Sequence, residues 1–389
     1  MPSPVFEELT SEISRGGVEA ALTRLSERLC EEQKYHDLFD ARLMKAHYRL
    51  GLPIILTASL DDLPEPQRSQ VENAYLEACR EVGAMLLEKG RVREAWMYLR
   101  PVGDKPAVAA ALRRIELTDE NTQEIIDVAL HEGVSPRYGF ELVLKQYGTC
   151  NAITMFDSVM HGQPRPQRED VARLMVRHLH GELIRNLRAE VAKQEGAQPA
   201  EQTIRELVSD RDWLFDADNY HIDTSHLHAV VRFARQTTDE ESLRLATDLT
   251  EYGRRLSRQY QYPGEEPFVD SHPTHALFFR AQLGEQVEEA LAYFRERAEA
   301  LPVAQHGPLP LETYVTLLAR LGRHREALDA LARLAPPGSQ LSGFAPTMLE
   351  LARTAGAFDR LMEICQERGD LLGFTAGLVE KNLPQRAAS

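Results

Sequence analysis

The chain has 389 residues, a formal net charge of −15 at pH 7 and 43% hydrophobic residues. This length suits two domains or one elongated repeat array, and the composition excludes wholesale disorder. An acidic surface repels phosphate backbones, so we expect no nucleic-acid partner.

The sequence predicts neither a secretory leader nor a membrane span. Residues 1–8 lack the basic start and apolar core of a signal peptide. The most apolar stretch, residues 52–60, is too short to cross a membrane and contains Pro53. Four cysteines lie far apart without a CxxC pair, which favours reduced thiols: Cys30, Cys79, Cys150 and Cys365. We therefore expect a cytoplasmic protein with no membrane partner.

Apolar residues recur at helical spacing along the chain, and no segment shows sustained strand alternation. The N-terminal quarter predicts helices over residues 18–29, 33–50, 67–88 and 92–100. The second of these ends at Gly51, with Pro53 two residues beyond. Gly accepts a left-handed cap and Pro cannot continue a helix, so this end has a clear physical cause.

The middle of the chain predicts further helices and one linker. Helical spacing covers residues 121–132, 136–147, 151–160 and 168–193. Residues 194–202 are small and polar and include a Gly and a Pro, which is typical of a linker. We therefore predict two regions, residues 1–195 and 203–389. The second region continues with helices over residues 203–208, 225–235, 239–259 and 273–282.

Two segments carry the same glycine and alanine spacing. In residues 86–99, Gly90 is followed five positions later by Ala95, and in residues 317–328 Gly322 is followed by Ala327. This pattern resembles the inter-helix turn of the tetratricopeptide repeat. In that family a Gly closes the first helix, and a small residue lets the second helix pack closely.

Two looser copies follow the same pattern. Gly284 is followed by Ala290 with one extra residue, and after Gly356 the small residue is replaced by Leu361. The resemblance implies an all-α fold, an α-solenoid of stacked antiparallel helical hairpins. This superfamily hosts scaffolds, regulators and some enzymes, and the leading function that the fold suggests is binding of a protein or peptide partner.

Two predicted helix starts in the second region are rich in His and Asp. In a solenoid, the helices over 225–235 and 273–282 would run parallel as neighbours, with their N-termini at the same edge. Residues 221–228 would then lie close to residues 270–275. Imidazole with carboxylate is the ligand set of zinc, iron or manganese. The candidate metal ligands are His221, Asp223, His226, Asp270, His272 and His275, with His228 beside them.

Such a site would support a second function, a metal-dependent enzyme such as a hydrolase, because a metal lowers the pKa of bound water. Without metal, the helix N-termini favour anions, and His could serve there as acid or base. The opposing interpretation is that these side chains are helix caps and surface residues. His226 and His228 are two apart on a helix, so they point in different directions.

A rival cluster lies on the second predicted helix, where His36, Asp40 and His47 fall on one stripe. This stripe could contact a ligand, although such stripes are more often solvated faces. Nucleotide and hydrolase motifs are missing: the sequence contains no GxGxxG, GxxxxGK[ST] or GxSxG.

Overall fold

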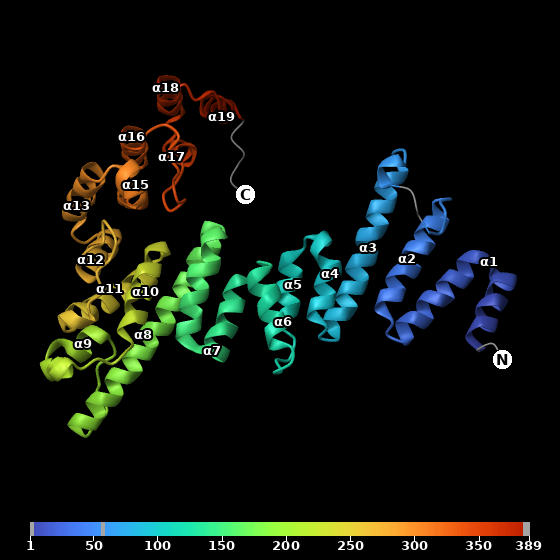
Figure 1. Ribbon diagram of the computed structural model, residues 1–389, viewed down its shortest axis with the longest axis horizontal. Helices are drawn as coiled ribbons and strands as arrows, with labels where there is room; N and C mark the ends of the chain where they lie inside the picture. The colour runs from blue at the N-terminus through green and yellow to red at the C-terminus, as the bar shows by residue number, and fades with distance from the viewer. Residues whose placement is uncertain (1–3, 56–58, 384–389) are drawn as a thin grey trace. The chain divides into compact units, whose positions relative to one another are not determined.

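The fold is all-α. The computed structural model describes residues 4–55 and 59–383, and in this part of the chain it contains helices and turns but no β-strand (Figure 1). The all-α prediction is confirmed. Residues 1–3 of the N-terminal segment and residues 56–58 of the apolar stretch lie outside the described residues. None of the helices in the described ranges is long and apolar enough to cross a membrane.

The chain divides into two compact units, Met1–Gln146 and Tyr147–Ser389. Within the first unit, successive helices pack on one another: α1 on α2, α2 on α3 and α3 on α4. Its core includes the fully buried side chains of Leu38, Leu86, Leu112 and Ile125. Its helices are α1 (Pro4–Glu31), α2 (Tyr35–Arg49), α3 (Gln67–Glu88), α4 (Val92–Val102), α5 (Lys105–Leu112), α6 (Thr122–Ile126) and the start of α7 (Pro136–Val159).

Two of the long helices are kinked at a glycine. Gly17 inside α1 and Gly148 inside α7 both have non-helical backbone angles, with φ near 78° and 79°. The helix predicted over residues 18–29 is therefore the second half of α1, and its first half was missed. The break predicted between residues 147 and 151 coincides with the kink in α7, next to the boundary between the two units.

The second unit is built around a long helix and an aromatic core. α11 and α10 both pack on α8, and α12 packs on α11. Phe268, Phe278 and Phe294 meet in its core with ring centroids 5.6 to 5.9 Å apart. Its helices are α8 (Arg165–Glu195), α9 (Ile204–Ser209), α10 (Thr224–Phe233), α11 (Glu240–Arg255), α12 (Ser271–Gln282), α13 (Val287–Ala300), α14 (Val303–His306), α15 (Leu309–Arg320), α16 (His324–Leu334), α17 (Met348–Ala355), α18 (Phe358–Arg368) and α19 (Leu371–Asn382).

The glycine turns expected from the sequence share one hydrogen-bond pattern. After α3, the N–H of Gly90 donates to the carbonyl of Leu87 and the N–H of Arg91 to that of Leu86, at 2.9 and 3.0 Å. Gly90 has a left-handed conformation, with a φ of 72°, and this conformation allows both hydrogen bonds to form. The same pair of bonds, with a positive φ, closes the turns at Gly284, Gly322 and Gly356.

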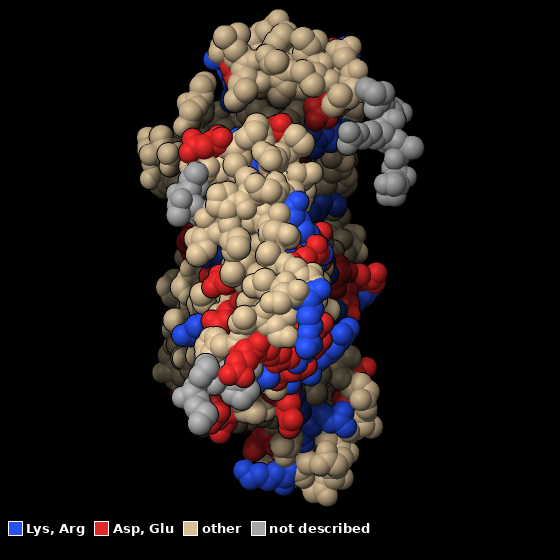
Figure 2. Space-filling model, turned by 90° about the vertical axis from the view of Figure 1, so that its right-hand side faces the viewer, with Lys and Arg blue, Asp and Glu red and all other residues tan. Residues whose placement is uncertain are grey.

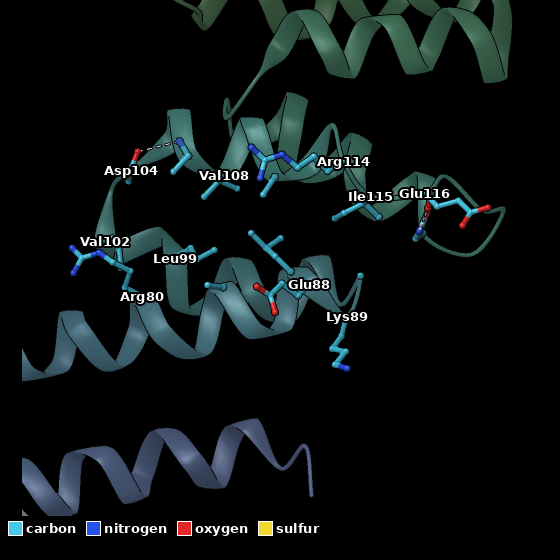
Figure 3. A pocket seen from close by; sticks show the side chains of 16 residues that line it. Arg80, Glu88, Lys89, Leu99, Val102, Asp104, Val108, Arg114, Ile115 and Glu116 are labelled. Carbon is cyan, nitrogen blue, oxygen red and sulfur yellow. Dashed lines mark hydrogen bonds between the residues drawn. The ribbon is translucent and has the colours of Figure 1, made fainter. Parts of the chain in front are cut away.

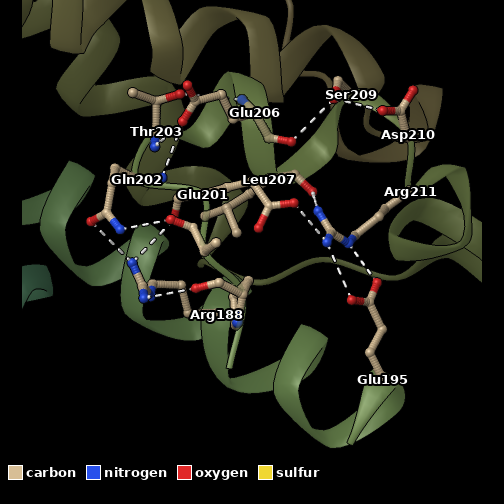
Figure 4. A network of polar contacts seen from close by, with 12 residues as sticks. Arg188, Glu195, Glu201, Gln202, Thr203, Glu206, Leu207, Ser209, Asp210 and Arg211 are labelled. Carbon is tan, nitrogen blue, oxygen red and sulfur yellow. Dashed lines mark hydrogen bonds and ion pairs between the residues drawn. The ribbon is translucent and has the colours of Figure 1, made fainter. Parts of the chain in front are cut away.

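The predicted linker over residues 194–202 lies within the second unit, and two arginines hold it through hydrogen bonds and ion pairs (Figure 4). Arg188 donates to the carbonyls of Pro199 and Glu201 at 3.0 and 3.1 Å. Arg211 pairs with Glu195 at 2.6 Å and with Glu201 at 2.8 Å. This segment is therefore a fixed turn between α8 and α9. The division of the chain at residues 195–203 remains a prediction from composition.

Candidate functional site

Asp223 and Asp270 lie at the two helix starts that the sequence singled out. The carboxylate of Asp223 caps α10, accepting the N–H groups of Ser225 at 2.9 Å and His226 at 3.2 Å. The hydroxyl of Ser225 lowers the pKa of Asp223, because it donates to the ionised carboxylate. The exposed side chain of Asp270 makes no cap bond at α12. Capping therefore accounts for Asp223.

His221 faces α11. The hydroxyl of Tyr252 receives the backbone N–H of His221 at 2.8 Å and lies 3.2 Å from its Nδ1. Burial lowers the pKa of His221, because the charged imidazolium loses its hydration. His221 is thus held by the buried Tyr252, while His226 is half-exposed.

The structure gathers three histidines around Ser271, one of which was not among the six candidate ligands. His228 Nδ1 lies 3.3 Å from the Ser271 hydroxyl, and His275 Nδ1 lies 2.6 Å from the Ser271 carbonyl oxygen. His272 packs against Gly253 of α11, where a Cβ would come within 2.4 Å of its ring. Burial lowers the pKa of His272 to about 4, and the nearby His228 adds to this effect. Burial also lowers the pKa of His228 and of His275, which favours the neutral form of all three rings.

The contacts of the predicted ligands differ from one residue to the next. His272 and His275 lie together with His228, whereas Asp223 is used as a helix cap and His221 contacts Tyr252. Over residues 4–55 and 59–383, no group of three or more His, Cys, Asp or Glu side chains is placed to hold a metal ion. The metal site at His221, Asp223, His226, Asp270, His272 and His275 therefore gains no support from the side-chain geometry and remains a prediction.

A cavity of about 280 Å³ lies beside His228 and His275. Arg232, Arg235 and Phe268 also line it, together with the loop that contains Glu265. The ring of His275 stacks on that of Phe268 with centroids 4.1 Å apart, and the guanidinium of Arg235 lies 4.9 Å from the Phe268 ring. Phe268 thus orients the two most buried polar side chains of the cavity.

Arg235 is a buried cation with an incomplete set of partners. The residue is 8% exposed, and burial lowers its pKa to about 10. Its Nε donates to the Arg232 carbonyl at 3.1 Å, and one Nη lies 3.3 Å from the Glu265 carboxylate. The other, Nη1, is buried without a hydrogen-bond partner in the described structure. A buried donor in this state is costly, more so on a charged group.

The sequence analysis did not single out Arg235. The available signal was the position of Arg235 directly after the mostly apolar residues 229–234, where a buried charge must be paired. Its partners could not be foreseen, because Phe268 and Glu265 lie about thirty residues further along the chain. Arg320 of α15 also donates to the Arg235 carbonyl at 2.8 Å.

The first unit contains a larger and more apolar groove. It has a volume of about 650 Å³ and lies between α3 and α4 on one side and α5 on the other (Figure 3). Leu99 of α4 and Val108 of α5 line the space from opposite sides. Along α5, Ala107 and Ala111 line the same groove, so no large side chain from α5 fills it at these positions.

Charges of both signs surround this groove. Arg80, Lys89 and Arg114 are exposed and form no ion pair with a described residue. Glu88 and Glu116 are exposed on the same rim. Several other cations of the unit are paired, such as Arg24 with Glu8 at 2.6 Å. The face shown in Figure 2 likewise carries Lys and Arg side chains next to Asp and Glu.

The stripe at His36 connects two helices of the first unit. His36 Nε2 lies 2.7 Å from the Glu94 carboxylate, and its Nδ1 lies 2.7 Å from the Tyr98 hydroxyl. Both ring nitrogens of His36 in α2 therefore contact side chains of α4. His47 Nδ1 faces the carbonyl of Ile54 at 3.1 Å. Contacts within the fold therefore account for His36 and His47, whereas Asp40 is exposed.

Comparison with protein-family models, with curated proteins and with solved structures gives no match. The function is therefore inferred from the groove, the cavity and the residues that line them.

Proposed function

We propose that this protein is a helical-repeat scaffold that binds a peptide segment of a protein partner in the groove of the first unit. The observation that carries the proposal is the apolar floor formed by Leu99 and Val108 in a groove of about 650 Å³. Amphipathic helices bind such grooves through apolar side chains one turn apart. Full burial of one such side chain contributes about 1.5–3 kcal/mol, and the cost of association offsets part of this gain.

The expected occupant is an amphipathic helix with charges of both signs beside its apolar face. The rim carries Arg80 and Arg114 as well as Glu88 and Glu116, none of them in an ion pair with a described residue. Complementary charges on the partner would fix its register and direction more than they would raise its affinity.

We also propose that the helices form a tetratricopeptide-like α-solenoid of antiparallel hairpins. The repeated glycine turns support this assignment, as does the full burial of the small residues Ala95, Ala290 and Ala327 after them. A cytoplasmic location belongs to the same proposal. All four cysteines are free in the structure, which suits a reducing compartment.

The test uses two matched substitutions on α5 of the full-length chain. Ala111 lines the groove, whereas the adjacent Ala110 is exposed and does not line it. Ala111→Glu places a charge in the apolar space and should weaken binding of peptides selected on the wild-type protein by about tenfold or more. Ala110→Glu adds the same charge and should leave binding unchanged. Peptide affinity is measured by fluorescence anisotropy, with thermal unfolding as the check on folding.

Two results would reject the groove as the binding site. One is equal affinity of the selected peptides for the Ala111→Glu and Ala110→Glu variants. The other is a selection in which no helical peptide binds the wild-type chain at micromolar concentration.

A further inference from the structure

Two residues that line the cavity in the second unit, Arg235 and His275, each have a buried polar atom without a hydrogen-bond partner among the described residues. Arg235 Nη1 is a donor without an acceptor, and His275 Nε2 is without a partner in the described structure. The proton of His275 is on Nδ1, because that atom lies 2.6 Å from a carbonyl oxygen, which can only accept. His275 Nε2 therefore carries a free lone pair. One ligand could satisfy both atoms.

The charges around the cavity limit the charge of such a ligand. Arg232 is balanced by Asp157, whose two oxygens lie 2.9 and 2.8 Å from its guanidinium. Arg235 is balanced less well, because Glu265 is 3.3 Å away and its side chain is 61% exposed. Water could fill the free hydrogen-bond position at Nη1, but it would not offset the buried charge. Arg235 carries a single positive charge, so a dianion would leave an excess negative charge in the cavity.

We propose that this cavity binds a small monoanionic carboxylate that also carries a hydroxyl group. The carboxylate accepts from Arg235 Nη1, and the hydroxyl donates to His275 Nε2. The stacked rings of His275 and Phe268 form one wall of the site. A cavity of about 280 Å³ admits a hydroxy acid of a few carbon atoms. This site lies wholly in the second unit, so it is independent of the peptide groove.

The site is built before any ligand arrives. Arg320 of α15 donates to the carbonyls of Arg235 and Thr237 at 2.8 and 3.1 Å, which fixes the backbone that carries the guanidinium. The loop opposite closes on itself, because the Gly264 N–H donates to the Val269 carbonyl at 3.1 Å. A Cβ at residue 264 would lie 2.1 Å from the Phe268 oxygen, so this turn requires glycine.

Isothermal titration calorimetry on the full-length protein tests the proposal with four probes: glycolate, acetate, glycolamide and inorganic phosphate. Glycolate should bind saturably at one site, and acetate about tenfold more weakly, because acetate lacks the hydroxyl donor. Glycolamide should not bind measurably, because it lacks the charge. Phosphate binding tighter than glycolate, or equal binding of glycolate and glycolamide, would overturn the proposal.

Three variants assign the binding to these residues. Arg235→Gln should weaken glycolate binding at least tenfold. His275→Phe keeps a ring on Phe268 and should remove the preference for glycolate over acetate. Glu265→Gln removes a competing carboxylate from an exposed position and should strengthen glycolate binding several-fold. This gain does not depend on the folding of the Arg235 variant, and a purely structural role for Arg235 would not produce it.

The control is Arg244→Gln, which removes an exposed arginine of α11 that does not line the cavity. Its affinity for glycolate should match that of the wild-type protein. Glycolate binding that Arg235→Gln, His275→Phe and Glu265→Gln all leave unchanged would show that the ligand sits elsewhere.

Discussion

Glu94 shows how a single side chain joins two helices of the first unit. Its carboxylate accepts from Arg91, the residue before α4, at 2.8 Å and lies 2.7 Å from His36 Nε2 of α2. The hydrogen bond from Arg91, followed by that from His36, lowers the pKa of Glu94 to about 2. The unfolded chain titrates near 4.5, so the folded state holds this proton more weakly.

This shift predicts a pH-dependent contribution to stability. A carboxyl whose pKa is lower in the folded state stabilises above pH 4.5, and the contribution disappears as the pH falls towards 2. Glu94→Gln should therefore lower the free energy of unfolding at pH 6 by less than about 1 kcal/mol, since the pair is partly exposed. The difference from wild type should shrink at pH 3. Urea unfolding at both pH values measures it.

Glu72→Gln is the control, because Glu72 is exposed on α3 and forms no ion pair with a described residue. A difference for Glu94→Gln that is the same at pH 3 and pH 6 would contradict the assigned role of its charge.

At the scale of the helices, similar glycine turns join several pairs of successive helices. Gly322 has a φ of 76°, and the turn that it forms joins α15 to α16 through bonds of 3.1 and 2.9 Å. Gly322→Ala should lower the free energy of unfolding by about 1–2 kcal/mol, because a Cβ disfavours this left-handed conformation. The matched control is Gly181→Ala within α8, where the nearest atom to a new Cβ is 3.5 Å away.

Gly181→Ala should instead stabilise the protein by about 0.5–1 kcal/mol, since alanine loses less backbone entropy in a helix. Chemical denaturation of both variants and the wild-type protein measures whether each substitution lowers or raises the free energy of unfolding. Equal effects of the two substitutions would mean that the backbone conformation at Gly322 is not the cause.

The helices differ in how well the sequence predicts them. α3 has the bounds expected from its apolar spacing, Gln67–Glu88, because a long amphipathic face and a glycine stop mark it. α5 was missed. It is short and its sequence, KPAVAAAL, is apolar on nearly every side, so it carries no helical period. The groove was therefore not foreseen, since α5 forms one of its walls.

The contacts of the predicted site residues could be read from the sequence only in part. Helix starts could be located from residues such as Asp223, and this residue is indeed a cap. The partners of a buried side chain depend on which elements pack together. His228 meets Ser271, 43 positions along the chain, and Arg235 meets Arg320 of α15. The spacing of residues in one segment carries no information about such contacts.

At the scale of the whole molecule, each compact unit buries its own core. Leu86 in the first unit and Phe294 in the second are both fully buried. Phe294→Ala should destabilise the second unit by about 3–5 kcal/mol. Amide hydrogen exchange should then accelerate in α12, α13 and α15, while protection in α2 and α3 persists.

Leu86→Ala is the reciprocal variant, with an expected loss of about 2–5 kcal/mol that is confined to the first unit. If either substitution accelerates exchange equally in both units, the chain unfolds as one cooperative body, and the two cores are not separate.

Arg320 has a consequence for how this protein can change over evolutionary time. Its guanidinium spans from α15 to the carbonyl oxygens of Arg235 and Thr237 and to the side chain of Gln282. A chain that exchanged this arginine for a smaller residue would leave those backbone acceptors without a donor. We therefore expect the residues at positions 235, 282 and 320 to be conserved together in related proteins. In a relative without the cavity, all three should be replaced together.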